Sequence, residues 1–252
     1  MIIAAKKMSE TLICVAVLLA CATSSIMAQP GQLQRPVRVV IITGMNSYSG
    51  HVWKETSAEL KNILEVDRRF RVTLESDPNY LANDALFGYD AAVLDFRNAE
   101  PLSSDEKDRA NLLKFLDLGK GLVVVHWADG AFPYWPEFTN IVGRAQQSHH
   151  DKRGPFEVKI VAKDHPITRN MKDFETDDEL YYDFKEGDRL ITVLATAHSK
   201  DLDKDSPMAM TVQFGKGRVF NTPLGHDVRA LKSPEVAELI RRGTAWAAGD
   251  LK

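Results

Sequence analysis

Cysteine is almost absent from this chain of 252 residues, and the only two, Cys14 and Cys21, lie near the N-terminus. The rest of the chain therefore has no disulfide, no thiolate metal ligand and no cysteine nucleophile. The net charge is −3 and no run of basic residues occurs, which argues against a nucleic-acid partner. With 44% hydrophobic residues, the chain can build a single α/β domain with a substantial core.

Several familiar catalytic motifs are also missing. There is no G-x-S-x-G elbow, no Walker loop, and no G-x-G-x-x-G after the first predicted strand. Serine-hydrolase, NTPase and dinucleotide-binding functions are therefore disfavoured. The short metal-binding signatures H-E-x-x-H and H-x-H are absent as well, so the sequence carries only a weak metal signal.

The first 28 residues have the features of a secretory signal peptide. Lys6 and Lys7 precede an apolar run over 12–22, and small residues lead to Ala28. We expect cleavage after Ala28 and an exported protein, periplasmic or secreted. The apolar run is shorter than a membrane span of about 20 residues, so no stable span is expected once the leader is removed. A retained anchor and a lipid anchor at Cys21 are the alternatives.

The remaining chain reads as a polar lead-in over 29–36 and one α/β domain over 37–252. Strands are predicted at 37–43, 70–74, 89–95, 122–125, 156–161 and 190–194, and helices at 51–66, 103–118 and 233–246. Residues 127–154 are predicted to form a loop. The βαβ alternation predicts a doubly wound, mostly parallel sheet. Near the C-terminus, apolar runs at 208–214 and 218–222 flank a Gly-Lys-Gly turn and predict a β-hairpin.

Polar side chains follow the carboxyl ends of these strands. They are Asn46 and His51 after the first, Asp95 and Arg97 after the third, His126 after the fourth, and His226 after the hairpin. Strand ends of a doubly wound sheet meet at one rim, where ligands bind, so we expect these residues to share a site. The alternative for each histidine is a structural hydrogen bond or a helix cap.

Three neutral imidazoles and a carboxylate would suit Zn²⁺ or a similar divalent ion. We expect His126, His149 and His226 as the metal ligands. His51 either replaces His149 or contacts the substrate. The alternative for His149 is a solvated position, because it lies in a polar segment.

The carboxylate-rich segment 176–182 has two interpretations. It is either a solvated acidic turn, or it points Glu179 inward beside Tyr181 as a general acid or base with a raised pKa. In the second case Glu179, Tyr181 and Asp95 form the catalytic set.

Aromatic residues between prolines and glycines suggest a surface that binds carbohydrate. The faces of Trp127 and Trp135 could stack on sugar rings, with Trp53, Arg97 and His51 as further substrate contacts. The alternative is that these aromatic rings belong to the core.

An ordered series of motifs resembles the ThuA-like (trehalose utilisation) domain over about Val37–Ala248. The motifs are Gly50–Lys54, Gly121–His126, Phe132 with Trp135–Glu137, Asp164–Thr168, Asp178–Tyr181, Val193–Ala197, Gly215–Phe220 and Leu224–Asp227. The resemblance implies a flavodoxin-like, doubly wound sandwich like that of class I glutamine amidotransferases. In those enzymes a cysteine nucleophile follows the strand that corresponds to Leu122–Val125. Here His126 stands in that place, so amidotransferase chemistry is excluded.

The resemblance implies a role in the metabolism of disaccharides and their 3-keto forms, without establishing trehalose as the substrate. We expect an exported enzyme, a hydrolase or lyase, that acts on a glycoside or keto-sugar by hydrolysis, elimination or hydration, with or without a metal ion. The alternatives are a non-catalytic carbohydrate-binding domain and a purely structural domain. The expected partner is a small carbohydrate.

Overall fold

The computed structural model describes residues 35–45 and 50–251. By their internal contacts, residues 35–252 form one unit, and the fold below is that of this unit. The predicted leader over 1–28 with Cys14 and Cys21, most of the lead-in, and Asn46 lie outside the described residues.

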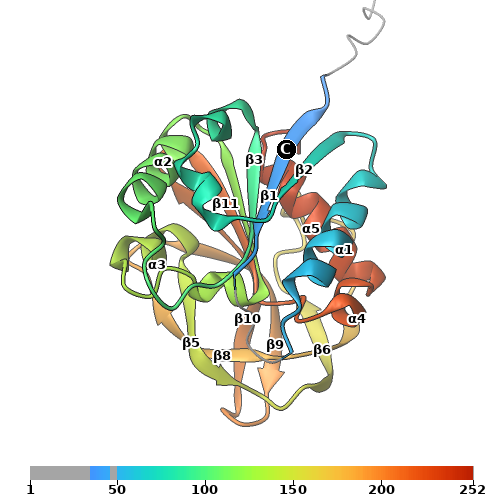
Figure 1. Cartoon of the computed structure of the whole chain (residues 1–252). Helices are drawn as coiled ribbons and strands as arrows, with labels where there is room; N and C mark the ends of the chain where they lie inside the picture. The colour runs from blue at the N-terminus through green and yellow to red at the C-terminus, as the bar shows by residue number, and fades with distance from the viewer. Residues whose placement is uncertain (1–34, 46–49, 252) are drawn as a thin grey trace, which may run out of the picture. The chain divides into compact units, whose positions relative to one another are not determined.

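A nine-stranded sheet in the order β2-β1-β3-β4-β11-β10-β9-β6-β7 forms the centre of the fold (Figure 1). Its strands are β1 (Val37–Thr43), β2 (Phe70–Glu75), β3 (Ala91–Asp95), β4 (Gly121–Val125), β6 (Gly154–Ile160), β7 (Phe174–Asp178), β9 (Ile191–Ser199), β10 (Lys204–Phe214) and β11 (Gly217–Thr222). The pairs from β2 to β11 are parallel. The pairs from β11 to β7 are antiparallel, and β10–β11 is the predicted hairpin. The predicted α/β fold with a parallel core is confirmed, although half of the sheet is antiparallel.

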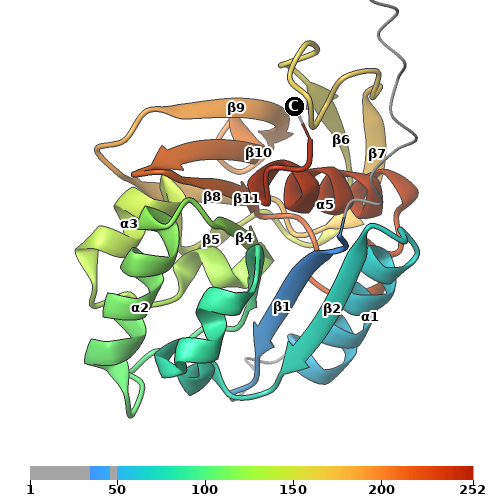
Figure 2. The same ribbon diagram turned by 90° about the horizontal axis from the view of Figure 1, so that it is seen from above.

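Helices cover both faces of the sheet (Figures 1 and 2). They are α1 (Trp53–Glu65), α2 (Asp105–Asp117), α3 (Pro136–Val142), α4 (Val228–Leu231) and α5 (Pro234–Ala247), with short 3-10 turns η1 (Pro78–Ala82), η2 (Asp84–Gly88) and η3 (His126–Gly130). Strand β1 shows why there are two layers. Val39 and Ile41 pack into a core with α1 and α5, whereas Val40 and Ile42 pack into a second core with α2 and α3. A strand buried on both faces needs the β-branched run found there.

The predicted loop over 127–154 is wrong. This segment contains most of η3, α3 and the strand β5 (Arg144–His150), which pairs with β8 (Tyr181–Glu186) in a separate two-stranded ribbon. Helix α3 has only seven residues, too few to show a clear helical period. Pro136 begins it and Gly143, with a φ of 78°, follows its end. These residues read as loop signals in the sequence but act here as helix ends.

None of the helices in the described part of the chain combines the length and the apolar character that a membrane crossing needs.

Close packing of α5 on the sheet gives a stability prediction. A Cβ atom added at Gly243 would lie 2.2 Å from Cδ1 of the buried Phe220 ring in β11. We expect Gly243→Ala to lower the free energy of unfolding by about 1–3 kcal/mol, although alanine favours a helix by about 1 kcal/mol. Urea denaturation measures the change.

Gly154→Ala is the control, because its added Cβ would meet only the Lys152 carbonyl oxygen, at 3.9 Å. We expect the free energy of unfolding of this variant to stay within about 0.5 kcal/mol of the wild-type value. A Gly243→Ala protein as stable as the wild type would show that α5 can move away from the sheet without loss.

Candidate metal centre

Four side chains converge at the carboxyl ends of the parallel strands. His51, His126, Glu179 and His226 each offer one ligand atom, and these atoms all lie within 4.8 Å of one another. His51 precedes α1, His126 follows β4, His226 follows β11, and Glu179 lies between β7 and β8. The three histidines reach this place because parallel strands end on a common edge. The cluster could hold a metal ion.

The Nε2 atom of His126 lies at the centre of the cluster. It is 3.1 Å from Nε2 of His51, 3.2 Å from Nδ1 of His226 and 2.8 Å from the hydroxyl of Tyr181. The other ring nitrogen, Nδ1, donates to the carbonyl oxygen of Pro223 at 2.7 Å. A carbonyl can only accept, so Nδ1 carries a proton, and in the neutral imidazole the lone pair on Nε2 faces the cluster.

The backbone at His126 adopts a conformation that is unusual for a residue with a side chain. Its φ is 49°, in the left-handed region, at the step from β4 into η3. This conformation costs roughly 1–2 kcal/mol for an L-residue. Backbone strain of this kind is concentrated at functional sites, where the surrounding structure holds it in place. Here it accompanies the turn that brings the imidazole against Pro223 and Tyr181.

Stacking orients His51. Its ring lies parallel to the indole of Trp127, with centroids 4.8 Å apart and planes 9° apart. The Trp127 N–H donates to Asp95 at 3.4 Å, and Asp95 also accepts from the hydroxyl of Thr56 at 2.9 Å. Burial, followed by the charges of His126 and His226, lowers the pKa of His51 to about 3. His51 is therefore a neutral imidazole, as metal binding requires.

Asp178 links two of the loops that carry ligands, and sequence reasoning missed it. Its fully buried carboxylate accepts hydrogen bonds from the backbone N–H groups of Glu179 at 2.8 Å, Gly225 at 2.7 Å and His226 at 3.1 Å. Burial raises the pKa of Asp178, and the charge of His126 and these three N–H groups oppose the rise. The density of carboxylates in 176–182 was the available signal, but it did not distinguish Asp178 from its neighbours.

Glu179 points inward, as one of the two interpretations expected. Its Oε2 atom lies 3.2 Å from Nδ1 of His226 and 3.5 Å from Nε2 of His126. The expected rise in its pKa is wrong. Burial acts in that direction, but hydrogen bonds and charge from His126 and His226 hold the pKa of Glu179 well below its usual range. Conversely, burial would lower the pKa of His226, but the Glu179 carboxylate raises it.

The prediction of His149 as a ligand is corrected. His149 is exposed, and its Nδ1 atom lies 2.7 Å from a carboxylate oxygen of Asp183. His51 takes the third histidine position instead. The neighbouring His150 faces the site, with Nε2 3.9 Å from Oε1 of Glu179. The shift in pairing register between Gln146 and His149 places these two histidines differently, and a sequence pattern does not reveal such a bulge.

The predicted aromatic platform is not present at its two tryptophans. Trp127 is 3% exposed and lies under His51, and Trp135 is 8% exposed and packs against Phe132 and Phe138. Neither face is open to a sugar ring. Trp53 is half-buried at the start of α1 and packs beside the second core. The two tryptophans therefore belong to the core, and Trp127 also supports His51.

Asp95, Tyr181 and Arg97 surround the cluster in different ways. Asp95 is buried and contacts the cluster only indirectly, because it accepts a hydrogen bond from Trp127, which stacks on His51. The Tyr181 hydroxyl contacts His126 directly. Arg97 is half-buried and turns toward β5, where it donates to the side chain of Gln146 at 2.5 Å.

Comparison with known proteins gives a consistent result. The ThuA family model, described as trehalose utilisation, matches residues 38–247. The structure of a ThuA-like protein from Parabacteroides merdae is 26% identical and has a TM-score of 0.76, covering 86% of this chain and 92% of that one. A ThuA-like protein from Bacteroides uniformis is 16% identical and has a TM-score of 0.70, covering 87% of this chain and 94% of that one.

A glutamine amidotransferase from Thermotoga maritima is 13% identical with a TM-score of 0.51, covering 84% of this chain and 98% of that one. This likeness shows a common fold. No curated protein sequence matches the chain significantly.

Asp95 makes stability depend on pH. Burial raises its pKa from 3.8 to about 7, against the hydrogen bonds from Thr56, Trp127 and Thr43. Between these values the folded protein keeps a proton that the unfolded chain has released, so stability falls as the pH rises from about 4 to 7. At about 1.4 kcal/mol per pKa unit, the loss is a few kcal/mol. Asp95→Asn should therefore match the wild type at pH 4 and exceed it at pH 8 in urea denaturation.

Asp90, just before the same strand, provides a control of opposite sign. Burial acts to raise its pKa, but Arg35 and the backbone N–H of Arg38 hold the pKa below its usual value. Asp90→Asn should therefore lose stability at pH 8 relative to the wild type. Parallel stability curves for the wild type and Asp95→Asn between pH 4 and 8 would contradict the burial of a protonated Asp95.

Proposed function

The chain belongs to the ThuA (trehalose utilisation) family, and from this premise we propose that it is an exported enzyme of carbohydrate catabolism with a divalent metal ion at the His51–His126–Glu179–His226 cluster. Membership of the family implies a role in carbohydrate metabolism. We further propose a glycoside or keto-sugar as the substrate, and hydrolysis, elimination or hydration as the reaction.

The spacing of the donor atoms carries the metal proposal. In a tetrahedral zinc site with bonds of about 2.0–2.1 Å, neighbouring ligand atoms lie about 3.3 Å apart. The cluster gives 3.1 Å from His51 to His126, 3.2 Å from His126 to His226, 3.2 Å from His226 to Glu179 and 3.5 Å from His126 to Glu179. Three imidazole nitrogens and one carboxylate oxygen suit zinc or a similar ion. The residues therefore fit the ion.

The chemistry follows from what surrounds the four ligands. The four residues would hold a divalent cation, which would supply Lewis-acid chemistry toward a sugar carbonyl that adds to them as a further ligand. A C–H group beside that carbonyl is acidic. We assign Glu179 as the base that accepts its proton, because its imidazole neighbours favour the ionised form that a base needs. The electron pair of the C–H bond forms a carbon–carbon double bond as the glycosidic C–O bond breaks. The departing oxygen takes up one proton. Addition of water across the double bond is the reverse type of reaction.

The two oxygens of Glu179 support this assignment. Oε2 faces His126 and His226, whereas Oε1 faces Nε2 of His150 at 3.9 Å. His150 has 38% of its side chain exposed, so it lies between the cluster and the solvent. A carboxylate placed in this way can bind an ion with one oxygen and exchange a proton with the other. The Tyr181 hydroxyl, 2.8 Å from His126, is the nearest neutral donor to the same place.

Metal content is the first test. We expect purified protein loaded with zinc to retain about one equivalent after dialysis, measured by elemental analysis. His226→Ala should weaken the zinc affinity at least 10-fold, because it removes one of four donors. His149→Ala is the matched control, since this exposed histidine pairs with Asp183 outside the cluster. Equal zinc retention by His226→Ala and wild type, or full activity of metal-free protein, would dismiss the metal.

The same assay tests the role of Asp178 in positioning the ligands. Asp178→Asn keeps the shape but places an amide beside backbone N–H donors, so we expect zinc affinity to fall by about 10–100-fold. Asp177→Asn is the control, because Asp177 faces Arg153 and Arg229 instead.

Turnover distinguishes an enzyme from a binding domain. Wild-type protein is incubated with a panel of disaccharides and their 3-keto derivatives, and products are identified by mass spectrometry. Hydrolysis adds one water, whereas elimination yields an unsaturated sugar and a free alcohol. Glu179→Gln should lower the rate by about 10²–10⁴-fold while sugar binding persists. Sugar binding without product from any member of the panel would favour the non-catalytic carbohydrate-binding domain.

A further inference from the structure

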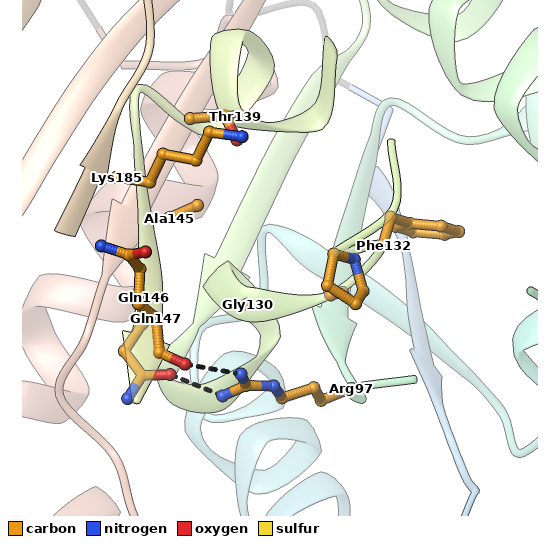
Figure 3. Close-up of a pocket in the computed structure, with 10 residues that line it drawn as sticks. Arg97, Gly130, Phe132, Thr139, Ala145, Gln146, Gln147 and Lys185 are labelled. Carbon is orange, nitrogen blue, oxygen red and sulfur yellow. Dashed lines mark hydrogen bonds between the residues drawn. The ribbon is translucent and has the colours of Figure 1, made fainter. Parts of the chain in front are cut away.

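A pocket of about 420 Å³ is lined by residues around Arg97, Gly130 and Lys185 (Figure 3). The residues that carry its chemistry are Arg97, Pro133, Thr139, Gln146, Gln147 and Lys185. They come from the segment after β3, the segment between η3 and α3, α3 itself, and the ribbon of β5 and β8. Small-molecule sites commonly have about 300–1,000 Å³, so the pocket can hold a sugar-sized ligand.

The same two chain segments, η3 and the ribbon of β5 and β8, contribute to the pocket and to the surroundings of the metal centre. Turn η3 begins at His126 and ends at Gly130, which lines the pocket, so one short turn joins the two. The ribbon does the same. At one end His150 pairs with Tyr181 beside the cluster, and at the other Ala145 pairs with Lys185 in the pocket wall. Strand β5 also packs against η3. Two segments of the chain therefore connect the pocket to the metal centre.

The charged side chains that line the pocket are all positive. Arg97 and Lys185 are the charged members of the ten lining residues, and none of the ten is Asp or Glu. In Figure 3 these two side chains lie at opposite ends of the pocket. Glu186, next to Lys185 in the chain, is paired with Arg144 at 3.2 Å. Such a lining favours an anionic group.

Arg97 is held in position by the ribbon. Its Nη1 atom donates to the side-chain oxygen of Gln146 at 2.5 Å, and Nη2 donates to the backbone oxygen of Gln147 at 3.1 Å (Figure 3). The carboxyl near it, Asp129, is fully buried, and burial raises its pKa well above the usual value against the charge of Arg97.

We infer that this pocket binds a carboxylate or phosphate carried by the sugar substrate, so that the protein acts on acidic rather than neutral sugars. The inference rests on the proposed function, because it places the anionic end of the same substrate that the metal centre binds. A guanidinium matches the oxygens of carboxylate and phosphate, and a lysine adds a second charge. Thr139 and Gln147 line the pocket as partners for sugar hydroxyls, and the exposed ring of Pro133 adds an apolar wall.

Isothermal titration calorimetry tests this inference with glucuronate, glucose 6-phosphate, glucose and inorganic phosphate. We expect at least one of the two acidic sugars to bind 10-fold or more tightly than glucose and than inorganic phosphate, and its affinity to fall as salt is added. If glucuronate binds tightly, the anionic group is a carboxylate, and if glucose 6-phosphate binds tightly, it is a phosphate. Lys185→Gln should weaken that binding about 10-fold. Lys204→Gln, an exposed strand lysine that does not line the pocket, is the control.

Two further variants separate this inference from the proposed function. Arg97→Lys keeps the positive charge but removes the planar guanidinium group. It should weaken the binding of the acidic sugar while zinc retention stays unchanged. His226→Ala should lose zinc but keep the preference for the acidic sugar. Equal affinity for glucose and both acidic sugars would overturn the inference, as would inorganic phosphate binding as tightly as glucose 6-phosphate. It would also be overturned if acidic-sugar affinity depended on His226 and not on Lys185.

Discussion

One hydrogen bond determines what the centre of this molecule can do. The Pro223 carbonyl accepts from Nδ1 of His126 at 2.7 Å, and this leaves the Nε2 lone pair directed at three other polar groups. His51, His226 and Tyr181 all approach that one atom. With the opposite tautomer, a proton on Nε2 would occupy the place where a cation is proposed. His126 could then not act as a metal ligand. The bond joins β4 to the segment after β11, two parallel neighbours in the sheet.

Three acidic side chains in and around the site differ in their partners and in the protonation form that these partners favour. Asp178 binds three backbone N–H groups and keeps the Glu179 and His226 loops side by side. Glu179 is instead surrounded by imidazoles, which favour its charged form. Asp95 lies farther out, where burial dominates and raises its pKa to about 7. Three acids in one region thus have different roles because their nearest neighbours differ.

The fold is shared with a glutamine amidotransferase. In this chain His126 follows β4 with its backbone in the left-handed region. This edge of the sheet therefore presents an imidazole. Arg97 and the ribbon of β5 and β8 extend this edge into a pocket with positive charge. The sheet provides the position, and the side chains at its edge decide the chemistry.

Sequence patterns were sufficient to predict the parallel core, the hairpin and the meeting of His51, His126 and His226. Each follows from apolar runs and from the rule that parallel strands end on one edge. The three-dimensional structure was needed to show that His150 rather than His149 faces Glu179, because a register shift in β5 sets their directions. It also decided that Trp127 and Trp135 are buried and that the pKa of Glu179 falls. Burial, register and pKa depend on neighbours distant in the chain, which a pattern within one segment cannot contain.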